Sequence, residues 1–209
     1  IAKPLHSLGK LEDMVIRIAG ITGTPDVEFG KRALVAMCAD NGVVEEGVTQ
    51  TGQEITALVS ENFLKGETSS CVMCRECHTD VIPVDVGMVT DTKVRKDHKV
   101  MYGTKNMTKE PAMTREQALL GIQAGISMAE ELKEKGYQLL VTGEMGIGNT
   151  TTSSAVASVL MNQPVGQGLP AKDWKERSAP SKLRSSCTDQ TRKMRWTYFP
   201  RWEDWILQL

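Results

Sequence analysis

The sequence predicts an α/β protein in which helices flank a parallel β-sheet of the Rossmann-like type. Short, almost continuously apolar segments alternate with longer amphipathic segments between residues 11 and 161. Strands that are buried on both faces of a parallel sheet have this apolar character, and crossover helices supply the alternation. Three of the short segments also end in an acidic residue near a glycine: Asp40, Asp85 and Glu144.

The spacing of apolar residues predicts each element in turn. Helical spacing is found in five segments, at residues 11–19, 53–65, about 67–77, 114–135 and 149–161. Apolar runs of strand length lie at residues 33–38 (ALVAMC), 81–86 (VIPVDV) and 138–142 (QLLVT). We expect all three runs to be buried strands. Residues 113–116 (MTRE) lie near the start of the fourth helix.

Composition excludes several classes of protein. The formal net charge of −1 over 209 residues favours neither a nucleic-acid partner nor a membrane surface. No apolar run reaches the length of a membrane span, and no export signal opens the sequence. The five cysteines, an odd number, do not suggest a disulfide framework. We therefore expect a cytoplasmic protein, since thiols stay reduced there.

The three acidic residues at strand ends point to a ligand site. In an open α/β sheet, ligands bind beyond the carboxyl ends of the strands. Any one of these acids is explained equally well by a turn, because Asp and Asn favour turns. Three acidic residues at the same edge of the sheet, however, favour a ligand site over three separate turns.

A glycine-rich segment that follows the third predicted strand is typical of a phosphate site. Residues 142–151 (TGEMGIGNTT) lead from this strand into the last predicted helix. Glycines allow the backbone to approach a ligand closely, and a helix N-terminus offers free N–H groups and a partial positive charge. The segment is neither a Walker loop nor a Gly-x-Gly-x-x-Gly fingerprint, which argues against a nucleotide-dependent oxidoreductase.

A cysteine-rich segment, residues 71–78 (CVMCRECH), allows a second interpretation. Cys74, Cys77 and His78 have the spacing of a c-type haem attachment, and three cysteines at this spacing resemble part of an iron–sulfur ligand run. No fourth cysteine lies at a suitable spacing, however. In a helix, Cys71 and Cys74 would share one face as small apolar residues. We favour this structural role over a haem or iron–sulfur carrier.

Four segments together resemble one family of enzymes. They are residues 3–12 (KPLHSLGKLE), 37–43 (MCADNGV) with 46–48 (EGV), 84–87 (VDVG) and 142–151. In this order and spacing they are similar to the nicotinate-nucleotide–dimethylbenzimidazole phosphoribosyltransferases, which act in cobalamin biosynthesis. The resemblance covers residues 3–168, and the last segment is the most specific. His6 stands where the family usually has Gly, and Asn41 where it often has His.

The resemblance implies a reaction and a site. Dimethylbenzimidazole attacks C1′ of nicotinate mononucleotide, nicotinate leaves, and α-ribazole 5′-phosphate forms, with no cofactor and no metal. Glu144 is then the auxiliary carboxylate beside the ribose, where positive charge develops. The phosphate ligands implied by the resemblance are Gly146, Gly148, Asn149, Thr150 and Thr151, and the residues implied for the base pocket are Asp40, Thr51 and Met145.

The same resemblance implies that part of the machinery lies elsewhere. The attacking base must lose a proton, and the family's general base is a glutamate far towards the C-terminus. No position in this sequence corresponds to it. We therefore expect a truncated copy with an incomplete fold and doubtful activity, derived from an enzyme that is a homodimer when complete.

The last residues, 169–209, differ in composition from the rest. From residue 170 onward the chain holds nine Lys and Arg against five Asp and Glu, together with every tryptophan of the sequence. We shifted the reading frame by joining the third base of each codon to the first two bases of the next codon. Around Trp174, every codon choice in the shifted frame encodes Leu-Glu. The shifted frame must also encode Asp at the position of Trp196, Gly at Trp202 and Leu-Asp around Trp205. These residues have the spacing of motifs found in the family. We therefore predict a domain over residues 1–168 and an out-of-frame tail without a native fold. The alternative is a genuine basic tail that binds a partner.

Two functions from different classes thus remain open beside the haem or iron–sulfur carrier. The first is the phosphoribosyltransferase. The second is a non-catalytic module that binds the phosphate of a nucleotide without turning it over. Product formation separates these two functions, and a visible absorption band would reveal the carrier.

Overall fold

A computed structural model describes residues 4–161 of the chain, and its centre is a parallel three-stranded sheet. The strands are β1 (Lys31–Ala39), β2 (Asp80–Gly87) and β3 (Tyr137–Met145), in the order β2-β1-β3. Both neighbours of β1 run parallel to it. The predicted α/β class and all three strands are therefore confirmed.

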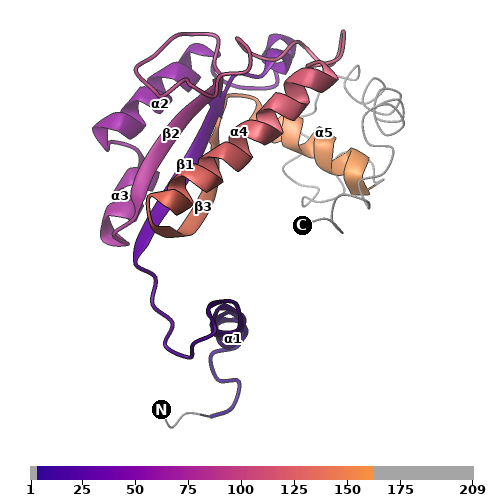
Figure 1. Ribbon diagram of the computed structural model, residues 1–209. Helices are drawn as coiled ribbons and strands as arrows, with labels where there is room; N and C mark the ends of the chain where they lie inside the picture. Colours follow the sequence, from indigo (N-terminus) through magenta and orange to yellow (C-terminus); the bar gives the residue numbers. More distant parts are fainter. Residues whose placement is uncertain (1–3, 162–209) are drawn as a thin grey trace.

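Helices cover both faces of this sheet (Figure 1). On one face, α2 (Glu54–Lys65) and α3 (Ser69–Glu76) supply Phe63 and Cys71, which pack against Ala36 of β1. On the other face, α4 (Arg115–Glu134) supplies Met128 and Leu132 to a second apolar cluster. This two-sided burial explains why β1 and β2 have apolar residues at nearly every position.

The helix boundaries follow local signals in the sequence. Thr114 caps α4, and its hydroxyl accepts a hydrogen bond from the Gln117 N–H while the Gln117 side chain accepts one from the Thr114 N–H. This reciprocal arrangement is a capping box. The last described helix, α5 (Asn149–Met161), also has the predicted bounds.

The prediction that the third strand is buried like the others is wrong for the described part of the chain. β3 is one of the two edge strands of the described sheet, and all its residues are exposed or half-buried, whereas β2 at the other edge contains buried residues. Val141, for example, is 42% exposed. An apolar run indicates a strand, but it does not show whether a neighbour covers both sides of that strand.

The N-terminal helix α1 (Lys10–Thr22) lies apart from the sheet and has no buried residue (Figure 1). Its apolar side chains face solvent in the described structure, among them Leu11, Met14 and Ile16. None of the helices within residues 4–161 combines the length and apolar character that a membrane crossing requires. The predicted tail, residues 169–209, lies outside the described residues.

Candidate anion-binding site

The carboxyl ends of the three strands bring most of the predicted site residues to one edge of the sheet. Glu144 lies opposite Met37 in the register, and Met145 lies opposite Cys38. Asp40 follows β1 directly, and its N–H donates to the Gly87 carbonyl at the end of β2. The glycine loop leaves β3 at this same edge and leads into α5.

Two glycines allow this loop to pass close to β1. A Cβ on Gly146 would lie 2.2 Å from the Ala39 carbonyl oxygen, so only glycine fits there without a shift. Gly148 has a φ of +86°, and a Cβ on it would lie 2.9 Å from the Val44 side chain. Both positions therefore require glycine because of the backbone itself.

Two side chains from other elements hold the central residue of the loop. The Thr56 hydroxyl of α2 accepts a hydrogen bond of 3.0 Å from the Ile147 N–H. The Asn41 Nδ2 donates to the Ile147 carbonyl at 3.1 Å. The Thr152 hydroxyl in turn donates to Asn41 Oδ1 at 2.9 Å. Three segments that are distant in the sequence thus fix one turn.

The start of α5 leaves two backbone donors without partners. The N–H groups of Asn149, Thr151 and Thr152 bond back to Gly146 or Gly148 carbonyls. Among the residues that the structure describes, no hydrogen bond engages the N–H of Gly148 or of Thr150. The first turn of α5 carries no acidic side chain. Free donors and the positive end of a helix dipole favour an anion here.

The side chains of the first turn of α5 are accessible to different extents. Thr150 is exposed, and its hydroxyl donates weakly to Asn149 Oδ1 at 3.4 Å. Asn149 and Thr151 are half-buried. These side chains can add donors to the two free N–H groups, and Glu144 is the exposed carboxylate at the end of β3.

Two of the three strand-end acids are occupied by residues that follow β2. Asp85 is fully buried; its Oδ1 accepts from the N–H groups of Gly87 and Met88, and its Oδ2 lies 3.1 Å from Lys99 Nζ. Asp40 is 1% exposed, and its Oδ2 accepts from the Val89 N–H at 2.8 Å. Glu144 alone of the three faces solvent.

The residues predicted to line the base pocket differ in burial and in their contacts. Asp40 retains a buried Oδ1 without a partner among residues 4–161. Met145 packs against the apolar clusters around Cys38 and Phe63. Thr51 is exposed in the loop before α2, and its carbonyl accepts from the Thr49 hydroxyl.

Two cysteines of the cysteine-rich segment pack as the helical interpretation expects. Cys71 and Cys74 are buried on one face of α3, whereas Cys77 ends the helix and is exposed. Burial raises the pKa of the Cys74 thiol. No group of three potential metal ligands in the described part of the chain includes a cysteine of this segment.

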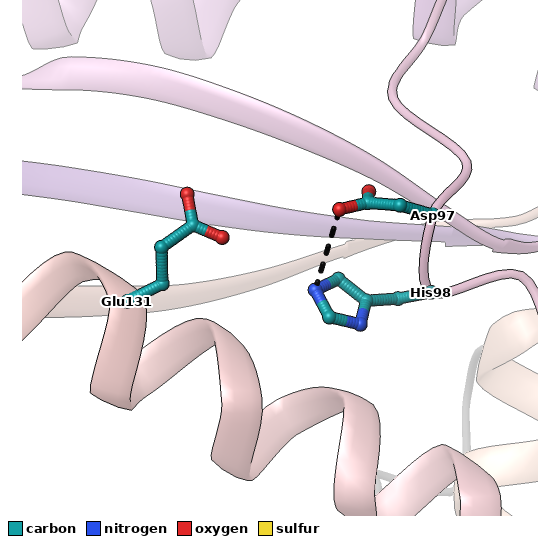
Figure 2. A group of neighbouring side chains, drawn as sticks. All are labelled: Asp97, His98 and Glu131. Atoms are coloured by element: carbon teal, nitrogen blue, oxygen red, sulfur yellow. Dashed lines mark ion pairs between the residues drawn. The ribbon is translucent and has the colours of Figure 1, made fainter.

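One such group does occur elsewhere, between the loop after β2 and α4. Figure 2 shows Asp97, His98 and Glu131, whose ligand atoms lie within 4.8 Å of one another. The Arg95 guanidinium already binds both carboxylates, with Nε 2.6 Å from Asp97 Oδ1 and Nη1 2.8 Å from Glu131 Oε1. A guanidinium therefore takes the place of a metal cation between these acids.

These features define an α/β protein with a glycine loop at the carboxyl edge of a parallel sheet, where a helix begins. A family profile described as Phosphoribosyltransferase matches residues 1–177. The chain belongs to this phosphoribosyltransferase family, as the resemblance predicted.

Individual relatives agree with the family match. A nicotinate-nucleotide–dimethylbenzimidazole phosphoribosyltransferase of Clostridium tetani is 49% identical over 162 residues, which are 77% of this chain and 45% of the relative. The enzyme of the same name from Ruminiclostridium cellulolyticum is 49% identical over 169 residues, covering 80% of this chain and 48% of its own. The chain spans about half the length of these curated relatives.

Solved structures share the fold. A nicotinate-nucleotide–dimethylbenzimidazole phosphoribosyltransferase from Thermus thermophilus superposes with a TM-score of 0.81 at 32% identity, over 91% of this chain and 58% of that one. A structure of CobT from the same organism gives a TM-score of 0.79 at 33% identity, over 92% and 59% of the two chains.

Proposed function

We propose that this protein binds nicotinate mononucleotide and takes part in the transfer of its phosphoribose to 5,6-dimethylbenzimidazole, a step of cobalamin biosynthesis. The observation that carries the proposal is a pair of N–H groups, on Gly148 and Thr150, that have no partner among residues 4–161 and follow the exposed Glu144 at the end of β3. The names of the relatives support the identity of the substrates.

The phosphate occupies the loop between Gly146 and Thr151. The N–H groups of Gly148 and Thr150 donate to phosphate oxygens, and the side chains of Asn149, Thr150 and Thr151 add donors. The positive end of the α5 dipole stabilises the dianion. The anchored phosphate then places C1′ of the ribose at the edge of the sheet.

Glu144 acts on the ribose as an auxiliary carboxylate. The bond between C1′ and the nicotinate nitrogen breaks while a nitrogen of dimethylbenzimidazole attacks, so positive charge develops on the sugar ring. The other ring nitrogen of dimethylbenzimidazole gives up its proton to a general base that this sequence does not supply. A nearby carboxylate stabilises this charge more in the transition state than in the ground state. The departing pyridinium becomes the neutral ring nitrogen of nicotinate, so no acid is needed to protonate it.

The acceptor base binds near Asp40, Thr51 and Met145. Asp40 supports this assignment best, because its Oδ1 is a buried acceptor without a partner in the described structure. Met145 offers an apolar, polarizable surface for the aromatic ring. We also propose a homodimer and a cytoplasmic location; the free thiols of Cys38, Cys71, Cys74 and Cys77 are compatible with a reducing compartment.

The experiment is a binding titration followed by a product assay. Nicotinate mononucleotide is titrated calorimetrically into the purified chain and into Thr150→Glu, which places a carboxylate at the exposed start of α5. We expect this variant to weaken binding at least tenfold, by repulsion on the order of 1.4 kcal/mol or more. Gln123→Glu adds the same charge at an exposed position of α4 and serves as the control. Equal affinities for all three proteins would rule out the proposed phosphate site.

Product formation tests the second candidate function, a module that binds the nucleotide without turnover. The residues proposed to bind the phosphate, between Gly146 and Thr151, all lie in this chain, which supports this candidate as an alternative. Dimethylbenzimidazole is added, and α-ribazole 5′-phosphate is detected by mass spectrometry. If product forms, Glu144→Gln should lower kcat on the order of 10²-fold. Binding without product would favour the non-catalytic module.

Residues 169–209 remain, in our proposal, an out-of-frame tail beyond a domain that ends near residue 168. The forced codons around the four tryptophans support this proposal. Resequencing the coding DNA from codon 160 to well past codon 209 tests it. A missing or extra base near codons 168–171 is expected, and an unaltered reading frame would favour a genuine basic tail.

A further inference from the structure

Asn41 occupies a position between the central strand and the glycine loop. It follows Asp40 at the end of β1 and is half-buried. Its carbonyl oxygen accepts from Gln53 Nε2 at 3.1 Å, which ties it to the start of α2. Its side-chain amide makes the two contacts to Ile147 and Thr152 described above. Asn41 therefore connects β1, α2, the loop and α5.

The contact with Ile147 determines which way one peptide group faces. In a trans peptide the C=O and the N–H point in opposite directions. Since Asn41 Nδ2 holds the Ile147 carbonyl, the N–H of the same peptide group, which belongs to Gly148, points away from Asn41. This is one of the two N–H groups without a partner within the described residues.

The opposite orientation of this peptide would present an oxygen to the ligand. Gly148 has a φ of +86° and no Cβ, so sterics oppose a rotation of the peptide less there than at other residues. A rotated peptide would direct the Ile147 carbonyl towards the anion, which repels it. The Thr152 hydroxyl donates to Asn41 Oδ1 and so keeps the NH₂ end of the amide turned to the Ile147 carbonyl.

We propose that Asn41 is a positioning residue for substrate binding: it locks the Ile147–Gly148 peptide so that the Gly148 N–H faces the phosphate. This inference rests on the proposed function and adds to it the residue that makes the loop selective for anions. Thr56 has a complementary role, because its hydroxyl accepts a hydrogen bond from the Ile147 N–H and so fixes the Gly146–Ile147 peptide. Asn41 itself does not have to touch the phosphate.

Asn41→Asp and Asn41→Ala test this positioning role in two ways. An aspartate cannot donate to the Ile147 carbonyl and repels it, whereas an alanine only removes the donor. We expect nicotinate mononucleotide to bind about tenfold more weakly to Asn41→Asp and about fivefold more weakly to Asn41→Ala, as one lost hydrogen bond implies. Asn62→Asp makes the same chemical change near the other end of α2, on a side chain that accepts from Lys65, and should bind like the parent.

The amide signal of Gly148 in ¹⁵N-labelled protein distinguishes positioning from a general loss of stability. In the parent chain and in Asn62→Asp, nicotinate mononucleotide should shift this signal, and in Asn41→Asp the shift should disappear while amides of β1 keep their positions. If Asn41→Asp does not fold, Asn41→Ala provides the same readout. If both Asn41 variants keep the parent's Gly148 shift and its affinity for nicotinate mononucleotide, the positioning role of Asn41 is wrong and the proposed function stands. A parent chain that shows no shift would overturn both.

Discussion

The close approach of the glycine loop to β1 gives a prediction whose magnitude can be worked out from the structure. A Cβ at position 146 would lie 2.2 Å from the Ala39 carbonyl oxygen, and real Cβ atoms essentially never come within 3.0 Å. Gly146→Ala therefore forces two backbone segments apart by about 0.8 Å, the difference of these distances. Such overpacking costs about 1–3 kcal/mol of unfolding free energy.

Gly121→Ala is the matched control for this substitution. A Cβ on Gly121 meets nothing within 4 Å, and the residue lies in the exposed part of α4. Alanine is favoured over glycine in a helix by about 1 kcal/mol, so this variant should be more stable than the parent. The unfolding free energies of the two variants should lie on opposite sides of the parent's and differ by about 2–4 kcal/mol.

Urea unfolding monitored by circular dichroism measures both effects, and nicotinate mononucleotide binding measures the consequence for the site. Gly146→Ala should also weaken binding, since separating the loop from β1 lengthens the bond between Asn41 and Ile147. If Gly146→Ala unfolds at the same urea concentration as the parent, the close packing of the loop on β1 is wrong.

Three further predictions concern the scaffold. Arg95 holds the pKa of Glu131 at about 2, so their pairing stabilises the fold above the ordinary pKa of a glutamate and is lost as the pH falls towards 2. Arg95→Met should therefore lower the unfolding free energy by about 0.5–1 kcal/mol at pH 7 and match the parent near pH 2 in chemical unfolding. The Asp80 carboxylate accepts from the Tyr137 hydroxyl and raises the pKa of Tyr137 to about 12; ultraviolet titration should show one tyrosine at that pH, and Asp80→Asn should lower its pKa towards about 10. Thr114→Ala removes the α4 cap and should cost about 1 kcal/mol, whereas Thr114→Ser should restore most of it in thermal unfolding.

The helices and strands were predictable because their signals are local. The capping box of α4 lies within four consecutive residues, and the apolar runs of β1 and β2 reflect burial on both faces. The exposure of β3 was not predictable from its own residues. β2 is also an edge strand of the described sheet, yet Phe63 of α2 and Cys71 of α3 pack near it and it contains buried residues. The burial of a strand therefore depends on which distant segments cover it, and its own residues do not show this.

The roles of the strand-end acids show a similar limit. The sequence places Asp40, Asp85 and Glu144 at one edge, and the structure agrees. Which of them is free depends on the loop after β2, where Lys99 lies opposite Asp85 and Val89 donates to Asp40. Burial opposes the charge of Lys99, yet the Asp85 and Asp91 carboxylates raise its pKa, so it remains a cation beside Asp85. No local pattern predicts such pairings.

The glycine loop was predictable as a motif, but the anion binding that we propose for it depends on residues outside the motif. Gly146 and Gly148 permit a backbone that passes close to β1, and the same freedom permits the opposite peptide orientation. The orientation is selected by Thr56 and Asn41, which contact Ile147 across 91 and 106 residues of sequence. Glycines make the proposed phosphate site possible, and only the folded structure shows which side chains select between the two peptide orientations. A substitution at Asn41 should therefore impair anion binding while every residue of the glycine motif is intact.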